Sequence, residues 1–296
     1  MKKLGFGCMR LPLTNPEDPT SVDLEQFCEM IDIFMDNGFT YFDTAYPYHQ
    51  KQSELFVKKA LVERYPRNSF TLADKLPVPF MKVKEDAKRI FDEQLEKCGV
   101  NYFDYYLLHS LNRNHYQAVL KFGCFDFIKK MKEEGKIREI GFSFHDTADI
   151  LDQILTEHPE MDFVQLQINY LDWNSESVQS KLCYETAVKH GKQVVIMEPV
   201  KGGSLVQVPQ DIKTQLQHLD NSLSIASWAI RFAANLKNVR VVLSGMSNLE
   251  QLNDNISYMK LDNRNQVKIK KISMIFHGFY CTLKIPEEKA LFFRVV

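Results

Sequence analysis

Apolar and polar positions alternate along the chain with two different periods. Short runs of apolar, β-branched and aromatic residues are each followed by a longer segment in which apolar residues recur at helical spacing. This order is typical of parallel β/α construction. The predicted strands are residues 3–8, 39–42, 70–73, 103–108, 139–142, 163–168, 193–197 and 239–243. The predicted helices are residues 22–37, 53–64, 83–98, 116–134, 147–157, 177–190, 224–235 and 249–259.

The residues at the segment ends agree with this assignment. The stretch Asp146-Thr147-Ala148-Asp149 offers a cap for a helix start just after the fifth predicted strand. Several predicted helices end at a glycine, where a left-handed C-terminal turn is needed. These glycines are Gly38, Gly99, Gly135 and Gly191.

Strands that are each followed by a helix favour a closed barrel. We therefore expect an α/β protein with one (β/α)8 TIM barrel domain, a fold that typically needs about 250 residues. The alternative is an open, doubly wound sheet. Its usual dinucleotide-binding turn, G-x-G-x-x-G, is incomplete here, because Gly5 and Gly7 are present but the third glycine is missing.

Composition narrows the possible partners. The 296 residues carry a formal charge of -1, with a pI near 6.7, so the chain has no general attraction to nucleic acid or anionic membranes. No apolar run approaches the roughly 20 residues of a membrane span, and the basic N-terminus lacks the apolar stretch of a signal peptide. We expect a cytoplasmic protein with no nucleic acid partner and no membrane partner.

The cysteines suggest neither a disulfide framework nor a metal site. They are far apart in the sequence and form no C-x-x-C pair. We expect free, mostly buried thiols and no metal ligands. The six residues are Cys8, Cys28, Cys98, Cys124, Cys183 and Cys281.

Four polar residues follow three consecutive predicted strands: Asp43 and Tyr48 the second, Lys75 the third and His109 the fourth. Catalytic groups of β/α barrels come from the C-terminal ends of strands. A lysine at a partly dry rim needs a counter-charge, which Asp43 can provide. Lys75 would lower the pKa of a nearby tyrosine, and a histidine could orient a carbonyl oxygen. Together these groups suit protonation of an oxygen while hydride arrives at carbon.

Each of the four also has a structural interpretation. Asp43 could cap a loop, Tyr48 could pack against other aromatic residues, Lys75 could be solvated, and His109 could be a core histidine. Their occurrence together at successive strand ends favours the catalytic interpretation.

The motifs around these residues resemble those of the aldo-keto reductase family. Residues 38–45 with Tyr48, and then Ser53-Glu54, resemble the Asp/Tyr signature of that family. Residues 70–77 resemble its lysine strand, residues 104–109 its histidine strand and residues 135–143 its fifth strand. The resemblance extends from about Leu4 to Met259.

This resemblance implies a reductase that binds NADPH or NADH, with Tyr48 as general acid, Lys75 and Asp43 tuning it, and His109 positioning the carbonyl. It also implies a cofactor site. Ser143 and Gln165 would hold the nicotinamide carboxamide, and Asp254 and Asn255 would lie near the adenine. The diphosphate and adenosine side would be lined by Glu198, Val200, Gly202, Gly203, Ser244, Gly245 and Met246.

Two positions depart from the family pattern. Met197 stands where many members have an aromatic residue that stacks on the nicotinamide. Gln251 stands where many have an arginine for the 2′-phosphate. NADP is the expected cofactor, with NAD as the alternative.

Residues 142–146, 197–203 and 244–250 look closest to a microbial branch of the family. Its members usually carry a C-terminal ferredoxin-like [4Fe–4S] segment. Here the similarity fades after about residue 260, and the following segment has one cysteine, Cys281, whereas a cluster needs four thiolates. We expect a barrel at residues 1–260, a diverged tail at 261–296 whose structure the sequence does not predict, and no iron–sulfur cluster.

The predicted function is therefore NAD(P)H-dependent reduction of a small aldehyde or ketone. A cofactor-binding redox sensor or regulatory module with little turnover is the alternative, suggested by Met197 and the atypical tail. A metal-dependent barrel hydrolase is a third possibility, because histidines are available at 49, 109, 115 and 145. However, no H-x-H pair ends an early strand.

Overall fold

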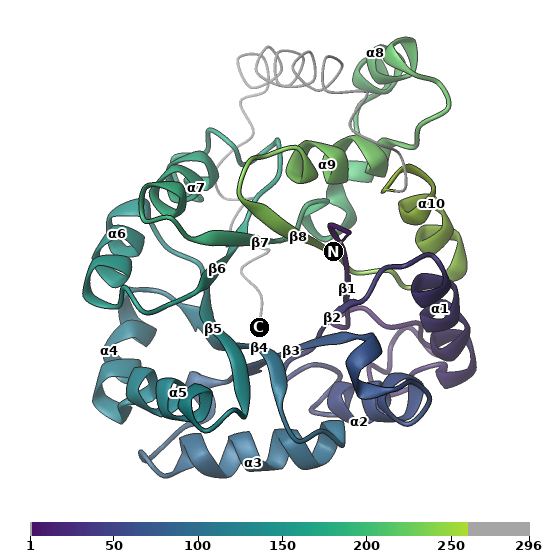
Figure 1. Ribbon diagram of the computed structural model, residues 1–296. Helices are drawn as coiled ribbons and strands as arrows, with labels where there is room; N and C mark the ends of the chain where they lie inside the picture. The colour runs from purple at the N-terminus through teal and green to yellow at the C-terminus, as the bar shows by residue number, and fades with distance from the viewer. Residues whose placement is uncertain (1, 260–296) are drawn as a thin grey trace.

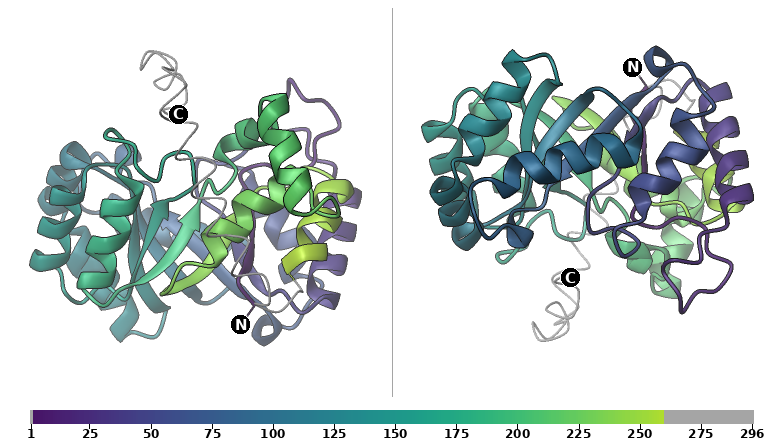
Figure 2. Two further views of the ribbon diagram at one scale, coloured as in Figure 1. Left: turned by 90° about the horizontal axis from the view of Figure 1, so that it is seen from above. Right: turned by 90° about the horizontal axis from the view of Figure 1, so that it is seen from below.

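The computed structural model describes residues 2–259. Eight parallel strands close into a barrel in sequence order, and helices surround it (Figure 1; Figure 2). The strands are β1 (Leu4–Gly7), β2 (Tyr41–Asp43), β3 (Thr71–Leu76), β4 (Phe103–Leu111), β5 (Ile137–Phe144), β6 (Phe163–Gln167), β7 (Gln193–Met197) and β8 (Val239–Ser244).

The helices on the outside alternate with these strands. They are α1 (Leu24–Asp36), α2 (Ser53–Val57), α3 (Asp86–Cys98), α4 (Arg113–Phe122), α5 (Cys124–Glu133), α6 (Ala148–Glu157), α7 (Ser180–Lys189), α8 (Gln210–Leu219), α9 (Ile225–Ala234) and α10 (Leu249–Met259). No helix within residues 2–259 is long and apolar enough to cross a membrane.

The pairing of β1 with β8 closes the sheet. Leu4 pairs with Val242 and Phe6 with Ser244, in the same parallel sense as all the other strand pairs. The predicted TIM barrel is confirmed, and the alternative of an open sheet is wrong.

One predicted helix was wrong, and one helix was missed. The single helix expected at 116–134 is two helices, α4 and α5, separated by Gly123 at φ 64°. A glycine in this left-handed conformation ends a helix, although apolar spacing continues on both sides. Helix α8, within the long segment between β7 and β8, was not predicted.

Smaller differences concern element ends. β3 and β4 run beyond the predicted residues 73 and 108, so Lys75 and His109 lie within strands. The helix predicted at 53–64 divides into α2 and a π-helical segment, Lys58–Val62. Thr147 is the N-cap residue of α6, but its side chain makes no capping hydrogen bond. The four glycines expected at helix ends all have positive φ. The predicted tail at 261–296, with Cys281, lies outside the described residues.

The barrel interior is filled by side chains from alternate strand positions. They form a buried cluster separate from the larger core between strands and helices. Its members are Tyr41, Ala73, Tyr105, Leu107, Phe163, Val195, Val241 and Leu243.

Two glycines make room for this large interior packing. A Cβ atom on Gly141 would lie 2.5 Å from the Phe163 carbonyl oxygen and 2.8 Å from its ring. A Cβ atom on Gly5 would lie 2.6 Å from Val241. Since the backbone of β6 cannot move aside cheaply, Gly141 is a steric requirement of the interior.

Gly141→Ala tests that requirement. We expect it to lower the free energy of unfolding by about 2–3 kcal/mol, because the methyl group overpacks the interior. Gly191→Ala is the matched control, since Gly191 has φ 68° but nothing within 4 Å of a Cβ position. It should cost about 1 kcal/mol, from backbone conformation alone. Equal losses of unfolding free energy in the two variants, measured by urea unfolding, would contradict the steric explanation.

Candidate active site

Polar side chains form the layer of the barrel interior at the C-terminal strand ends. Side chains in a strand alternate between its two faces, so residues two positions apart share a side. Asp43, Lys75 and Gln165 each follow an interior residue (Tyr41, Ala73 and Phe163) by two positions. They therefore continue the interior side into the barrel mouth.

The Lys75 ammonium is the centre of this layer. Its Nζ atom lies 2.5 Å from Asp43 Oδ1 and 2.7 Å from the carbonyl oxygen of Thr44. It lies 3.4 Å from the Tyr48 hydroxyl. The Lys75 and Asp43 side chains are only 1% and 4% exposed. The predicted convergence of these groups from neighbouring strands is observed.

The ion pair controls the charge of the lysine. Burial alone would lower the pKa of Lys75, but the Asp43 carboxylate and Tyr48 outweigh it, and the pKa is raised. Burial raises the pKa of Asp43, and the charge of Lys75 opposes that rise. Lys75 is therefore a fixed cation at neutral pH.

The predicted lowering of the Tyr48 pKa is wrong as a net effect. The pKa of Tyr48 is raised, because burial of the tyrosine outweighs the attraction of Lys75 for the phenolate. Asp43 adds to the rise. Lys75 does act in the expected direction, but it is not the largest influence. Tyr48 is thus fully protonated at neutral pH and able to donate.

His109 faces Tyr48 across the mouth of the barrel. The two rings are 6.1 Å apart between centroids, at an interplanar angle of 80°. Burial and then the charge of Lys75 hold the pKa of His109 well below its usual range. The imidazole is therefore neutral and carries one N–H donor. Both Tyr48 and His109 are partly exposed, so a ligand can reach them.

A bulge in β4 sets the position of His109. The register with β5 shifts between Leu108 and Leu111, and Ser110 has φ 57°. The Ser110 N–H donates to Ser143 Oγ at 2.7 Å. Ser143, predicted as a nicotinamide ligand, thus also holds the residue that follows His109.

A buried network behind the sheet holds Lys75, and the sequence did not indicate it. Gln94 Nε2 on α3 donates to the Lys75 carbonyl oxygen at 3.1 Å. The Tyr106 hydroxyl donates to Gln94 Oε1 at 2.5 Å. Gln94 occupies a core-facing helix position, and a polar residue at such a position is the only sequence signal that could have revealed this role.

A left-handed turn follows Tyr48 directly. His49, Gln50 and Lys51 have φ of 50°, 52° and 68°. The turn is held by His49, whose Nδ1 lies 2.7 Å from the Pro19 carbonyl oxygen and whose Nε2 accepts from the Leu11 N–H at 3.3 Å. These partners require a neutral imidazole that donates at Nδ1. His49 thus links the turn carrying Tyr48 to the segment after β1.

Gln165 and the segment after β7 occupy the other side of the mouth. Gln165 Nε2 donates to Asp43 Oδ2 at 3.2 Å, so this predicted carboxamide ligand also braces the ion pair. Glu198 has φ 52°, and burial raises the pKa of its carboxyl. Gly202 and Gly203 have φ of 62° and 95°. Val200 lies between Glu198 and these glycines and is partly buried.

The loop after β8 leads into α10. Asn255 Nδ2 donates to Ser244 Oγ at 2.7 Å, and Gln251 Oε1 accepts from the Ser247 N–H at 2.8 Å. Asp254 accepts from the Ser224 hydroxyl at 2.7 Å. These predicted cofactor residues therefore hold the loop and its helix in shape.

The middle of that loop presents backbone. The Met246 side chain is fully buried, and Gly245 has none. Met246 and Gly245 can therefore offer a ligand little beyond their main-chain groups.

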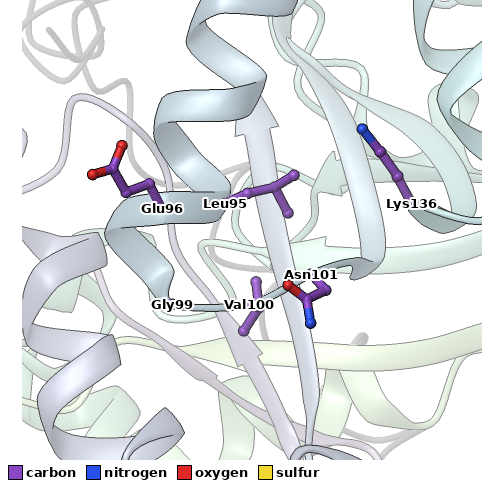
Figure 3. A pocket seen from close by; sticks show the side chains of 6 residues that line it. All are labelled: Leu95, Glu96, Gly99, Val100, Asn101 and Lys136. Atoms are coloured by element: carbon purple, nitrogen blue, oxygen red, sulfur yellow. The ribbon is translucent and has the colours of Figure 1, made fainter.

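A surface cavity of about 500 Å³ lies away from these residues (Figure 3). It is lined by Leu95, Glu96, Gly99, Val100, Asn101 and Lys136. Residues 99–101 and Lys136 directly precede β4 and β5, so the cavity is at the N-terminal end of the barrel. Chemistry in this fold occurs at the opposite end.

The described part of the chain contains no set of side chains suited to bind a metal ion. Residues 2–259 contain no group of three or more His, Cys, Asp or Glu side chains arranged to hold a metal ion. The cysteines in this range are free.

The family model of the aldo/keto reductase family matches residues 3–275. The chain belongs to this family. Its similarity to a curated relative, a probable aldo-keto reductase 1 from Glycine max, is 29% identity over 198 residues. That match covers 64% of this chain and 54% of the relative, so the chain aligns with about half of the relative's length.

Solved aldo-keto reductase structures share the fold. The holo form of a Bacillus halodurans enzyme superimposes with a TM-score of 0.71 at 22% identity, covering 93% of this chain and 91% of that one. A Klebsiella pneumoniae aldo-keto reductase in complex with NADPH gives 0.68 at 18% identity, covering 92% and 90%.

Acidification should show that the stability of this family member depends on a neutral His49. Burial lowers the pKa of His49 in the folded protein, while the unfolded chain titrates near 6.5. The unfolded state therefore binds more protons below about pH 6.5, and stability falls as the pH drops towards the folded value. His49→Gln, whose amide can also donate and accept, should flatten the fall in urea midpoint between pH 7 and 5. The exposed His218→Gln is the control, and an unchanged slope in both variants would contradict the assignment.

Proposed function

We propose that this aldo-keto reductase family member reduces small aldehydes or ketones with NADPH. The observation that carries the proposal is the convergence of the Lys75 ammonium with Asp43 and the Tyr48 hydroxyl, opposite His109. A carbonyl oxygen placed between Tyr48 and His109 would meet two neutral donors. This arrangement suits stabilisation of negative charge that develops on oxygen.

The proton transfer can be followed at named atoms. The Tyr48 hydroxyl donates its proton to the carbonyl oxygen, and the phenolate oxygen that forms lies 3.4 Å from the Lys75 ammonium. When bound, with its carboxamide held by Ser143 and Gln165, reduced nicotinamide would supply the hydride to the carbonyl carbon. The raised pKa of Tyr48 keeps its hydroxyl protonated before the transfer. The Lys75 ammonium then stabilises the Tyr48 phenolate that remains.

His109 would position the substrate. Its pKa lies well below the usual range, so it donates a hydrogen bond from a neutral ring without competing as an acid. Its place opposite the Tyr48 ring confines the carbonyl oxygen to the space between them. This orientation of reacting groups is itself a source of rate acceleration.

The residues around the mouth fit a dinucleotide. Gly203 has φ 95° and nothing within 4 Å of a Cβ position, so backbone there can approach a ligand closely. The loop from Ser244 leads directly into the N-terminus of α10, which suits phosphate. The NADPH complex of the Klebsiella pneumoniae relative supports the same cofactor for this chain.

Tyr48→Phe tests the proposal. We expect kcat for a generic aldehyde, followed by nicotinamide absorbance, to fall by roughly 10²–10⁴-fold, because the proton donor is lost. Binding of NADPH, followed by protein fluorescence, should persist. Tyr46→Phe is the matched control, since the Tyr46 hydroxyl points to Glu93, at 3.2 Å, and not to Lys75.

Two outcomes would contradict the proposal. Full activity in Tyr48→Phe would remove the tyrosine from the mechanism. Tight NADPH binding by the wild type without turnover across a broad carbonyl panel would favour a cofactor-binding sensor.

A further inference from the structure

Arg10, three residues after β1, spans the two loops at the side of the barrel mouth. Its side chain is exposed and runs along Gly245, where a Cβ atom would lie 3.2 Å from Arg10 Cδ. Its guanidinium ends beside Gly202, where a Cβ atom would lie 3.1 Å from Nη2. One side chain therefore joins the loop after β8 to the segment after β7.

Hydrogen bonds connect the backbone around Arg10 both to the loop after β8 and to the site around Tyr48 and Lys75. Ser247 Oγ donates to the Arg10 carbonyl oxygen at 3.1 Å. The next residue, Leu11, donates its N–H to His49 in the turn after Tyr48. Cys8 donates its N–H to the Asp43 carbonyl oxygen at 2.8 Å. Arg10 thus lies between the Tyr48–Lys75 centre and the loop that leads into α10.

The charges nearby leave Arg10 available to a ligand. Lys201 is committed to Asp172, with Nζ and Oδ1 2.5 Å apart. Arg10 forms no ion pair with any carboxylate among residues 2–259. Glu198 is close enough to interact with Arg10 through space, although burial dominates its titration. An arginine that has no carboxylate partner in this range and is held between two glycines is suited to bind an added anion.

We propose that Arg10 binds the diphosphate of the dinucleotide cofactor, bridging the Gly202 and Gly245 loops around it. Phosphate sites in β/α barrels are commonly formed by the loops after the seventh and eighth strands, next to a helix N-terminus. Both loops contact Arg10 here. The inference rests on the proposed function, because it presumes that a dinucleotide occupies this face.

The position of Arg10 favours the diphosphate over the 2′-phosphate. The backbone on either side of Arg10 is bonded to β2 and to the turn after Tyr48, where hydride transfer is proposed. Gln251 lies beyond Ser247, in the first turn of α10. A group shared by NADPH and NADH is therefore the expected ligand.

The test compares dissociation constants of NADPH and NADH, measured by protein fluorescence, for the wild type, Arg10→Gln and Arg10→Lys. Arg10→Gln should weaken both cofactors by roughly 10- to 100-fold, the usual effect of losing a charge-assisted hydrogen bond. It should also make the dependence of affinity on salt shallower. Arg10→Lys should restore part of the affinity. The control is Arg113→Gln, at an exposed arginine after β4 at the same end of the barrel. It should change the dissociation constant of neither cofactor.

The possible results separate the two proposals. Equal weakening of NADPH and NADH supports the diphosphate assignment. A loss confined to NADPH overturns it in favour of a 2′-phosphate contact. Unchanged constants in Arg10→Gln, with normal binding by the wild type, overturn the role of Arg10 and leave the reductase proposal intact. Failure of the wild type to bind either cofactor overturns the proposed function itself.

Discussion

The buried ion pair between Lys75 and Asp43 is the constraint on which the site depends. Removing either partner would leave an uncompensated charge inside the barrel, typically at a cost of several kcal/mol. The Thr44 carbonyl and the Gln165 amide complete the shell around the pair. Three strands, β2, β3 and β6, must therefore keep their register for the charges to meet. The proposed chemistry and the stability of this end of the barrel rest on the same contacts.

The surrounding structure limits how far these groups can move. Gln94 holds the backbone of Lys75 from outside the sheet, and Tyr106 holds Gln94. His49 fixes the turn that carries Tyr48. Each support is a buried or partly buried hydrogen bond, so the Tyr48 hydroxyl and the Lys75 ammonium are positioned before any ligand arrives. Such preorganisation is what a site needs to stabilise developing charge without first rearranging.

Much of the fold and the central residues could be predicted from the sequence, because both produce strong local signals. Alternating periods identified the eight strands, and polar residues after apolar runs identified Asp43, Lys75 and His109. The break at Gly123 was missed because apolar spacing continues across it. The pKa of Tyr48 was predicted in the wrong direction, because sequence shows a neighbouring charge but not the degree of burial. Gln94 and Arg10 make contacts with residues distant in sequence. The polar residue at a core-facing position of α3 was the one signal for Gln94, and it does not show which residue Gln94 contacts.

The packed barrel axis has a kinetic consequence. Tyr41, Tyr105 and Phe163 are at most 5% exposed and plug the centre beneath Lys75, so nothing passes through from the opposite end. Two molecules that bind together at this mouth must therefore both enter from the same end of the barrel. The molecule that binds deeper must bind first and dissociate last. The packed interior therefore implies an order of binding and release.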